Sequence, residues 1–327
     1  MHHFCTLFDS GYLLRGLTLY RSLCKKDEKF RLYILCLDEV AYRIISVIDI
    51  DNIIPINLKE IEEWDCDLIE VKKNRKTVEY YFTLSPLLPL YILRTINNVD
   101  IITYLDADLF FFNSPDVLYK EMNNNSTLII EHDYSRVVEE KYSGHGKYNV
   151  EYLSFRNDKE GIACLERWGE QCKNWCFDRV ENGLYADQAY LNEWPTLYKN
   201  LVISKNKGAG LAPWNCNKYK LKINNSEIYV NEDKLVFFHF HGIKILSNCF
   251  ISQNLRSYGA KLSSDIKARL YRKYISEIKE TYKWLKSNGI SGISFTDKVI
   301  SRRTKLTSNR TLIDRLINLI SSLYFVC

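Results

Sequence analysis

Two aspartates, Asp106 and Asp108, are the residues of this chain whose type and spacing most clearly point to chemistry. They follow the apolar run at residues 101–105 and precede a second apolar run at residues 109–112. Apolar runs of this length are typical of buried strands in an α/β core. A carboxylate buried between them destabilises the fold unless another group neutralises it. Hard cations such as Mg²⁺ or Mn²⁺ take oxygen ligands, so the pair predicts a metal site at a strand end.

An Asp-x-Asp tripeptide has a second reading. It also occurs as a solvated turn or as a helix cap in many proteins. A surface turn does not need apolar runs on both sides, whereas a site at the edge of a buried sheet does. The flanking residues therefore favour the metal site.

Length and composition are those of an ordinary globular protein. The 327 residues can bury a sizeable core in one large domain or two smaller ones. The net charge of +5 is modest, and the basic residues do not form a stripe through the predicted core domain. This distribution argues against a dedicated nucleic-acid binder, and we expect no nucleic-acid partner.

Ten cysteines are scattered through apolar surroundings, where a reduced thiol behaves as a small hydrophobic group. No Cys-x-x-Cys pair is present, and Cys172 and Cys176 lack the paired spacing of a zinc site. Reduced thiols fit the cytosol. No signal-peptide pattern precedes the first predicted strand, and no apolar stretch is long enough to cross a bilayer, so we expect a cytoplasmic protein.

Strand and helix signals alternate in the first part of the chain, which predicts an α/β architecture with βαβ units. Strands are predicted at residues 4–8, 30–37, 53–57, 101–105, 109–112, 127–131 and 235–240. Helices are predicted at residues 12–24, 39–48, 78–95 (interrupted by Pro86 and Pro89), 160–177, 185–193 and 263–287, and another opens at Pro115-Asp116. The glycine-rich segments at 143–147 and 207–210 predict a mobile loop and a turn.

The end of the chain has a different texture. From Lys298 onward six basic residues and one acidic residue precede an apolar terminus at residues 316–327. This pattern predicts an amphipathic helix that binds an anionic membrane surface. A helix packed on the preceding domain, or a tail that binds a partner protein, fits the same pattern.

Three further segments accompany the carboxylate pair. Phe8-Asp9-Ser10-Gly11-Tyr12 closes the first strand, Ala186-Asp187-Gln188 opens a predicted helix, and His239-Phe240-His241-Gly242 closes a late strand. Together with Tyr104-Leu105-Asp106-Ala107-Asp108, their order and spacing resemble the GT-A-fold glycosyltransferases over residues 4–245. The likeness is greatest to the retaining family 8, which includes glycogenin and bacterial lipopolysaccharide galactosyl- and glucosyltransferases.

The resemblance implies a fold and a set of ligands. The fold is GT-A, a Rossmann-like mixed central sheet flanked by helices. Here it would form a catalytic domain at residues 1–258, followed by a helical extension at residues 259–327 that carries the basic amphipathic tail. In the family, both aspartates and a distant histidine hold Mn²⁺ or Mg²⁺ against the diphosphate of a sugar nucleotide. These ligands would be Asp106, Asp108 and His239, with His241 as the rival histidine.

Other matches imply where the donor lies. Asp9 and Tyr12 match positions that contact uracil, which implies a UDP-sugar donor, although Asp9 also fits an ordinary helix cap. Asp187 and Gln188 match a catalytic pair near the donor hydroxyls and the reacting carbon, although an Asp at a helix start is also favoured by the helix dipole. The remaining donor-binding matches are Ala107 in the Asp-x-Asp turn, Asn149 in an Asn-x-Gly turn that lines the sugar site, and Gly242.

The chain departs from the family pattern at three places. Glu151 stands where the Asn-x-Gly turn usually has glycine, and Thr83 stands where an arginine is usual. The Lys-Pro-Trp that usually follows His-x-x-Gly is absent, because Lys244 comes one position early and Ile245 occupies the expected position. We therefore expect Lys244, or another cation such as Arg15, to contact the diphosphate. These departures leave open a neighbouring GT-A family with a different stereochemical outcome.

The sequence thus predicts a metal-dependent hexosyltransferase, peripheral on the inner face of the membrane. It would move a hexose from a UDP-sugar to a glycan or lipid-linked acceptor in cell-surface polysaccharide synthesis, such as that of lipopolysaccharide. A non-catalytic nucleotide-sugar-binding scaffold is an alternative, because losing transition-state contacts can abolish catalysis while binding survives. A nucleotidylyltransferase would need an early glycine-rich, Arg-bearing loop, which residues 9–20 lack. A phosphatase would need Thr or Val shortly after Asp108, where Leu109-Phe110 stands.

Overall fold

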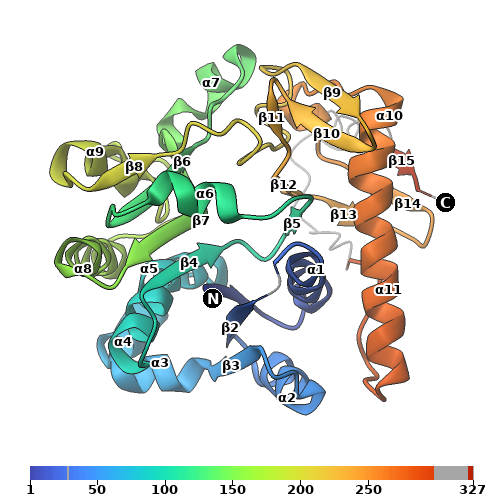
Figure 1. The fold of residues 1–327 in the computed structure, drawn as a ribbon. Helices are drawn as coiled ribbons and strands as arrows, with labels where there is room; N and C mark the ends of the chain where they lie inside the picture. Colours follow the sequence, from blue (N-terminus) through green and yellow to red (C-terminus); the bar gives the residue numbers. More distant parts are fainter. Residues whose placement is uncertain (28, 298–322, 327) are drawn as a thin grey trace, which may run out of the picture.

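The computed structural model describes residues 1–27, 29–297 and 323–326. Its centre is a mixed sheet of seven strands in the order β3-β2-β1-β4-β7-β6-β8 (Figure 1). The first four run parallel, β7 is antiparallel to both of its neighbours, and β8 is parallel to β6. The strands of this sheet are β1 (His2–Phe8), β2 (Phe30–Cys36), β3 (Ile53–Asn57), β4 (Ile101–Leu105), β6 (Thr127–Glu131), β7 (Tyr148–Arg156) and β8 (Leu201–Ile203).

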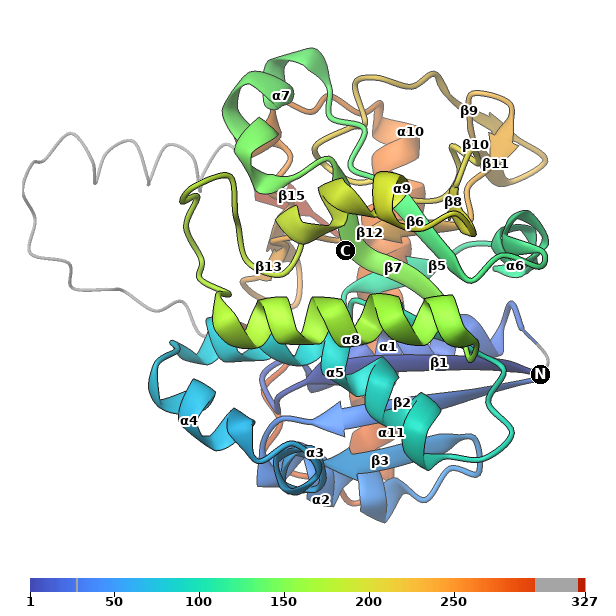
Figure 2. The ribbon, with the colours of Figure 1, turned by 90° about the vertical axis from the view of Figure 1, so that its left-hand side faces the viewer.

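Helices cover both faces of this sheet. On one face α5 packs against α8, and on the other α1 lies against the sheet with α11 packed on its outer side (Figures 1 and 2). The α-helices are α1 (Leu13–Cys24), α2 (Glu39–Ile48), α3 (Leu58–Trp64), α4 (Asp67–Lys73), α5 (Thr77–Thr95), α6 (Asp116–Met122), α7 (Arg136–Tyr142), α8 (Lys159–Asn174), α9 (Trp194–Leu197), α10 (Ser264–Lys267) and α11 (Lys273–Ser287). The expected α/β class with a Rossmann-like mixed sheet is confirmed.

Alternation of side chains along the strands produces two hydrophobic cores. Phe4, Leu32 and Ile34 belong to the core under α1 and α11, whereas their neighbours Cys5 and Tyr33 belong to the core under α5 and α8. Successive side chains of a strand point to opposite faces, so a strand buried on both faces is apolar throughout. This is why the early strands were predictable as continuous apolar runs.

Three smaller sheets complete the structure. One pairs β5 with β12, and the other two are β11-β10-β9 and β13-β14-β15. Their strands are β5 (Leu109–Phe111), β9 (Leu221–Asn224), β10 (Glu227–Val230), β11 (Asp233–Lys234), β12 (Phe237–His239), β13 (Lys244–Ile245), β14 (Phe250–Ser252) and β15 (Leu323–Phe325). The sheet of β5 and β12 is the one that bears on the functional site, because it joins the segment after Asp108 to the segment that ends in His239.

Several expected helices differ in the structure. Helix α5 runs without a break through Pro86 and Pro89, both of which are buried, so the expected interruption is wrong. The helix predicted at 185–193 is replaced by turns and a short 3₁₀ helix, Ala189–Glu193. Pro195 lies in the first turn of α9 rather than ending a helix, because the first turn needs no proline N–H. The glycine-rich loop at 143–147 contains a 3₁₀ turn, Ser143–His145.

Past residue 260 the long predicted helix is confirmed as α10, a π-helical turn (Ala268–Arg272) and α11. It shares one hydrophobic core with α1, and the hydroxyls of Thr18 and Thr281 lie 3.0 Å apart between the two helices. This packing does not decide where one domain ends, so the expected domain boundary after residue 258 stays a prediction. None of the helices that the structure describes combines the length and the hydropathy that a membrane crossing requires.

The predicted basic tail lies largely outside the described residues. Where the described chain resumes, Leu323–Phe325 form β15, which pairs with β14, so the predicted helix is wrong for these residues. Eight cysteines are free in the structure, including Cys172 and Cys176, and the expectation that the thiols are reduced stays a prediction for them. Cys249 departs from it, because it is disulfide-bonded.

Gly16→Ala is expected to destabilise the protein although alanine favours helices. A Cβ at Gly16 would lie 2.1 Å from Cε1 of the Phe8 ring at the end of β1. Such overpacking costs about 1–3 kcal/mol, more than the gain of about 1 kcal/mol from helix propensity. Urea denaturation measures the free energy of unfolding, and Cys24→Ala, at the exposed end of the same helix, is the control. Equal stability of the two variants would contradict the packing of α1 on β1.

Candidate active site

The candidate site lies at the carboxyl end of β4, where the chain turns through Asp106-Ala107-Asp108 into β5. Strand β5 pairs antiparallel with β12, with Leu109 opposite His239. This register brings His239 beside Asp108, although more than a hundred residues separate them in the sequence. The backbone N–H of Phe240 donates to the carbonyl of Asp108 at 3.0 Å and closes the arrangement.

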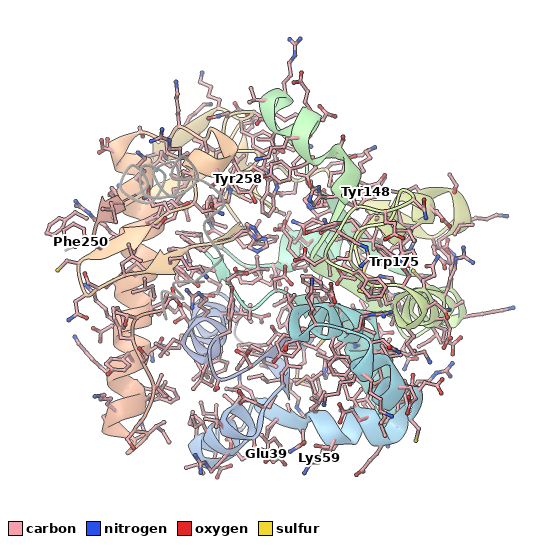
Figure 3. All side chains as sticks on the ribbon, turned by 180° about the vertical axis from the view of Figure 1, so that it is seen from behind. Glu39, Lys59, Tyr148, Trp175, Phe250 and Tyr258 are labelled. Atoms are coloured by element: carbon pink, nitrogen blue, oxygen red, sulfur yellow. The ribbon has the colours of Figure 1, made fainter. Side chains whose placement is uncertain are left out.

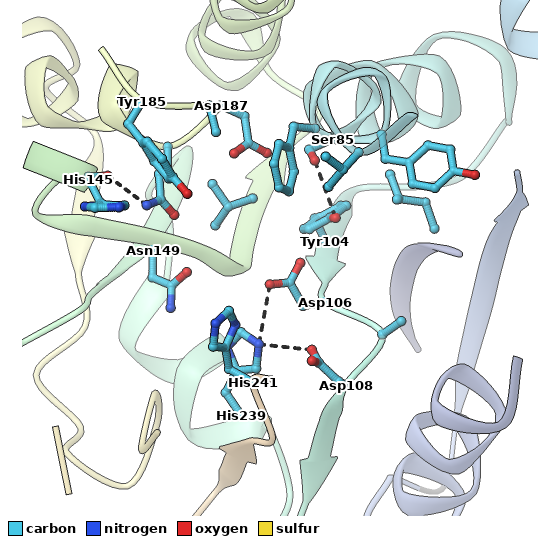
Figure 4. Close-up of a pocket in the computed structure, with 18 of the residues that line it drawn as sticks. Ser85, Tyr104, Asp106, Asp108, His145, Asn149, Tyr185, Asp187, His239 and His241 are labelled. Carbon is cyan, nitrogen blue, oxygen red and sulfur yellow. Dashed lines mark hydrogen bonds and ion pairs between the residues drawn. The ribbon is translucent and has the colours of Figure 1, made fainter. Parts of the chain in front are cut away.

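Asp106, Asp108 and His239 form a compact cluster. One potential ligand atom from each residue lies within 4.8 Å of the others. Nε2 of His239 is 3.0 Å from Oδ1 of Asp108 and 3.8 Å from Oδ2 of Asp106. Figure 4 shows both carboxylates turned toward this imidazole. The structure therefore brings together the three ligands that the sequence predicted.

Behind the cluster lies a carboxylate whose role sequence reasoning missed. Glu151 comes from β7, directly beside β4, and its backbone carbonyl accepts a hydrogen bond from the N–H of Asp106 at 3.0 Å. Its side chain is fully buried, and Oε2 lies 2.6 Å from Nδ1 of His239. A carboxylate on the far ring nitrogen fixes the orientation of a metal-binding histidine. The available signal was a charged residue in place of the usual glycine.

Burial and charge set the protonation of the cluster. Burial alone would lower the pKa of His239, but Asp108 and Glu151 raise this pKa well above its ordinary value. Burial would raise the pKa of Asp108, but the charge and hydrogen bond of His239 lower it to about 2. Burial raises the pKa of Asp106 to about 7, although the charge of His239 acts in the opposite direction. One histidine thus holds neighbouring carboxylates together.

The cluster fits a divalent cation. Two carboxylate oxygens and one imidazole nitrogen match the ligands that Mg²⁺ and Mn²⁺ take, and the histidine is already oriented by Glu151. The side chain of Asp106 remains partly exposed, at 30%, and it lines a cavity. The cluster is therefore reachable by a cation and by a ligand of that cation.

This cavity has a volume of about 660 Å³ and passes from the end of β1, over the cluster, to the segment before Ala189. Asp187 and Tyr185 lie on one side of it, and Asp108 and His239 lie on the other (Figure 4). The rival histidine, His241, also lines it. Most of the predicted site residues line the cavity: Asp9, Tyr12, Asp106, Ala107, Asp108, Asn149, Asp187, Gln188 and His239.

At the β1 end, Asp9 shapes the turn that leads into α1. Its Oδ1 accepts hydrogen bonds from the backbone N–H groups of Gly11 (2.9 Å) and Tyr12 (3.2 Å). The hydroxyl of Tyr81 donates to its Oδ2 at 3.4 Å. Asp9 thus closes the turn before α1 and also faces the cavity, but it is not the helix cap that the sequence offered as an alternative, because the N-cap position of α1 is Tyr12. The ring of Tyr12 is 39% exposed beside it.

At the other end, Asp187 and Gln188 are held by different contacts. Nε1 of Trp168 donates to the backbone carbonyl of Asp187 at 2.8 Å. Burial raises the pKa of the Asp187 carboxyl to about 7. The side-chain amide of Gln188 donates to the carbonyl of His145 at 2.7 Å. The glycine-rich segment at 143–147 is therefore tied to this side of the cavity.

Three predicted contacts are not in the cavity wall. Gly242 has φ +69°, a backbone conformation that favours glycine. A Cβ there would also lie 2.2 Å from Nδ2 of Asn254, so local conformation and packing explain the glycine. Lys244 is exposed on β13 and does not line the cavity. Arg15 is buried and paired with Asp297 at 2.7 Å.

The charged residues that line the cavity determine which ligands it suits. Among the described residues of its wall there are four aspartates and no lysine or arginine: Asp9, Asp106, Asp108 and Asp187. The expectation that Lys244 or Arg15 contacts a diphosphate therefore finds no support in the wall. The positive charge in this wall is that of His239, which is already paired with Asp108 and Glu151, so an anionic ligand would find no lysine or arginine to receive it.

The comparisons agree with this geometry at the level of the fold. No family model matches the chain. Two proteins of Bacillus subtilis (strain 168) are each 28% identical: Uncharacterized protein YfnD, over 75% of this chain and 79% of its own, and Uncharacterized protein YfnF, over 75% and 82%. A solved structure of the galactosyltransferase LgtC, in complex with donor and acceptor sugar analogs, superimposes with a TM-score of 0.53 and 15% identity. That match covers 85% of this chain and 95% of LgtC. The expected GT-A fold is confirmed.

Glu151→Gln is expected to weaken Mn²⁺ binding by about tenfold or more while the protein stays folded. The amide keeps the size of the side chain but no longer attracts the Nδ1–H of His239 as a carboxylate does. Titration of Mn²⁺ in the presence of UDP, followed by the electron paramagnetic resonance of free Mn²⁺, measures the affinity. Glu140→Gln, on the exposed surface of α7, is the matched control. Wild-type affinity in Glu151→Gln would show that Glu151 does not orient the ligand.

Asp187→Asn is expected to change how stability depends on pH. As pH rises above the unfolded-state pKa of 3.8, the unfolded chain loses this proton, while the folded protein keeps it until about pH 7. Asp187 therefore contributes stability at low pH that is lost across this window. The variant lacks this loss, so its stability relative to wild type should rise by roughly 2 kcal/mol between pH 5 and pH 8. Denaturant titrations at both pH values measure it, and an unchanged difference would contradict the raised pKa.

Proposed function

We propose that this protein is a metal-dependent glycosyltransferase that transfers a hexose from a UDP-sugar to a glycan or lipid-linked acceptor in cell-surface polysaccharide synthesis. The observation that carries the proposal is the Asp106–Asp108–His239 cluster at the end of β4, in the wall of a cavity that also holds Asp187 and Gln188. The GT-A fold supports it, because ligands of α/β sheets bind at the carboxyl ends of the strands.

In this proposal Asp106, Asp108 and His239 hold Mn²⁺ or Mg²⁺. A divalent cation at this place supplies positive charge to the diphosphate leaving group. The protein contributes the orientation of the ligands: Glu151 holds His239, and the ladder between β4 and β7 holds Asp106. Ala107 lies between the two aspartates with its backbone at the cavity wall.

The donor is proposed to lie along the cavity with its base at the β1 end. There Tyr12, Tyr81 and Phe82 offer rings, and Asp9 offers carboxylate oxygens for the base. Asp187 and Gln188 would then face the hexose, with Asp187 binding its hydroxyls. Nδ2 of Asn149 is buried without a hydrogen-bond partner among the described residues, and it is available to the same sugar. A retaining outcome is proposed from the resemblance of these residues to family 8.

An anionic membrane surface is proposed as a further partner. The support for it is the run of basic residues from Lys298 to Arg315 in the sequence, which lies outside the described residues. An acidic lipid surface attracts such a segment. Localisation at the inner face of the membrane depends on the same segment.

A second candidate function is a non-catalytic nucleotide-sugar-binding scaffold. The observation that favours it is the absence of lysine and arginine from the described cavity wall. Fixed cations at a leaving diphosphate contribute to transition-state stabilisation, so their absence removes one source of catalysis without removing the binding cavity. Transfer or hydrolysis of a UDP-hexose in the presence of Mn²⁺ distinguishes the enzyme from the scaffold.

Nucleotide binding is expected to depend strictly on the cation. Because the described wall offers four aspartates and no lysine or arginine, and because His239 is paired with Asp108 and Glu151, UDP should bind with Mn²⁺ and not measurably with EDTA. Asp108→Asn should weaken Mn²⁺-dependent UDP binding by at least about tenfold and abolish transfer. Calorimetry with UDP, and with GDP as the control for the base, measures this. Asp51→Asn, on the exposed surface, is the control variant.

The results separate the possibilities. Preference for GDP would keep a glycosyltransferase but remove the roles of Asp9 and Tyr12. Tight UDP binding in EDTA would show that the cation is not needed to offset the carboxylates. Failure of every nucleotide to bind in either condition would overturn the proposed function.

A further inference from the structure

One part of the cavity is walled by rings from segments far apart in the sequence. We call it the aromatic chamber, defined by Tyr134, Tyr142, His145, Tyr185, Trp214 and Tyr258. We propose that the aromatic chamber is the acceptor subsite and that it binds a neutral pyranoside, a saccharide without carboxylate or phosphate groups. This inference rests on the proposed function and names the chemical class of its acceptor.

The rings of the chamber support one another at its rim. The Tyr142 and Tyr258 rings lie 5.3 Å apart, and the His145 ring lies 5.1 Å from Tyr142 and 4.1 Å from Tyr185. The Trp214 ring meets the Tyr258 ring edge-on at 6.0 Å. A pyranose has an apolar C–H face that suits such rings, and cavities for small molecules are lined mostly by aromatic side chains.

The burial of these rings differs from that of core aromatics. Phe155 and Trp168, in the core under α5 and α8, are fully buried. The four tyrosines of the chamber are only partly buried, and each of them lines the cavity. Packing within the protein therefore leaves ring surface uncovered in the chamber. An apolar ligand face would remove that surface from water.

Unpaired polar atoms give a second and independent indication of a ligand. Nε1 of Trp214, which is an N–H donor, and Nδ1 of His132, which donates or accepts according to its tautomer, are buried without a hydrogen-bond partner among the described residues. Both side chains line the cavity, and neither residue is more than 5% exposed. A buried donor without a partner is costly, and hydroxyl oxygens of a sugar accept hydrogen bonds from such groups.

Charge restricts the saccharide to a neutral one. The chamber has no lysine or arginine in its described wall, whereas Asp187 follows Tyr185 closely in the chain and lines the same cavity. Above about pH 7, where Asp187 is ionised, a uronic acid or a sugar phosphate would bring a negative charge toward this carboxylate with no lysine or arginine in the described wall to receive it. A neutral sugar meets no such penalty.

The chamber also adjoins the metal cluster. The Trp214 ring lies 5.2 Å from the His239 ring, edge to face, so one side chain borders both places. An acceptor on the chamber rings would therefore present a hydroxyl near the cluster and Asp187, where the donor sugar is proposed to lie. This position is the one that transfer requires.

The test uses the full chain at pH 8, where Asp187 is ionised, with saturating UDP and Mn²⁺. The probes are the methyl pyranosides of glucose, galactose and mannose, and the matching methyl glucuronide and galacturonide. Saturation-transfer NMR detects binding, and titration gives the affinity. We expect at least one neutral glycoside to bind and the uronides to bind more weakly. Tyr142→Ala and Tyr258→Ala should each weaken the neutral glycoside roughly five- to tenfold and leave the affinity for UDP with Mn²⁺ unchanged.

Two further variants keep the test decisive. Tyr258→Phe keeps the ring and should keep most of the glycoside affinity, which separates ring contact from loss of fold. Phe250→Ala removes an aromatic ring that projects from β14 at the outer edge of the molecule and does not line the cavity, so it should change nothing (Figure 3).

The outcomes that overturn the inference differ from those that overturn the function. Uronides that bind as well as neutral glycosides, glycoside binding that both alanine variants retain, or no glycoside binding by a protein that binds UDP with Mn²⁺ would each overturn the acceptor subsite. A protein that binds no nucleotide loses the proposed function instead. Glycoside titration without nucleotide then decides whether the chamber binds a neutral sugar at all.

Discussion

The structure depends on how several carboxylates are held around one buried histidine. Asp108 and Glu151 lie at 3.0 Å and 2.6 Å from the two ring nitrogens of His239, and Asp106 lies at 3.8 Å. Charges removed from water persist only where partners are well placed. The placement here comes from two strand pairings, β4 with β7 and β5 with β12, and from close backbone approach. A Cβ at Gly210, for example, would lie 3.0 Å from Oε1 of Glu151.

The same cluster sets the electrostatics of the cavity. Its described wall carries four aspartates and no lysine or arginine, and His239 is paired with carboxylates, which is why a bound cation is the proposed source of positive charge for a nucleotide diphosphate. Arg15 carries a positive charge of the kind that binds phosphate groups. Its guanidinium instead pairs with Asp297 and donates to the carbonyl of Ile243. Its guanidinium also lies 4.8 Å from the centre of the Tyr12 ring. Arg15 therefore supports the cavity wall from behind instead of contacting a ligand.

Short-range signals made part of this predictable. The strand ends at Asp106 and His239, and the alternating elements of the first part of the chain, are visible as apolar runs. Strand β7 was not predicted, because the polar residues Asn149, Glu151 and Ser154 interrupt its apolar run. These residues are buried by neighbouring strands and loops that lie far away in the sequence. Glu151 was seen as a departure from a pattern, but its contact with His239 depends on two long-range strand pairings. The tyrosines of the chamber were also missed, because they come from separate turns and helix ends; of its rings, only Trp214 stood out in the sequence, within Ala212-Pro213-Trp214-Asn215.

Trp214 and the loop that carries it connect the metal cluster with the aromatic chamber. The Trp214 ring makes T-shaped contacts with the rings of His239, His241 and Tyr258. The loop that carries it is held by Asn215, whose side-chain amide donates to the carbonyls of His132 and Gly210. Gly210 is also the residue that packs against Glu151. One short loop thus positions both the ring that borders the metal ligands and the carboxylate that orients them. Because interiors are densely packed, a change in this loop would displace the metal ligands and the chamber wall together.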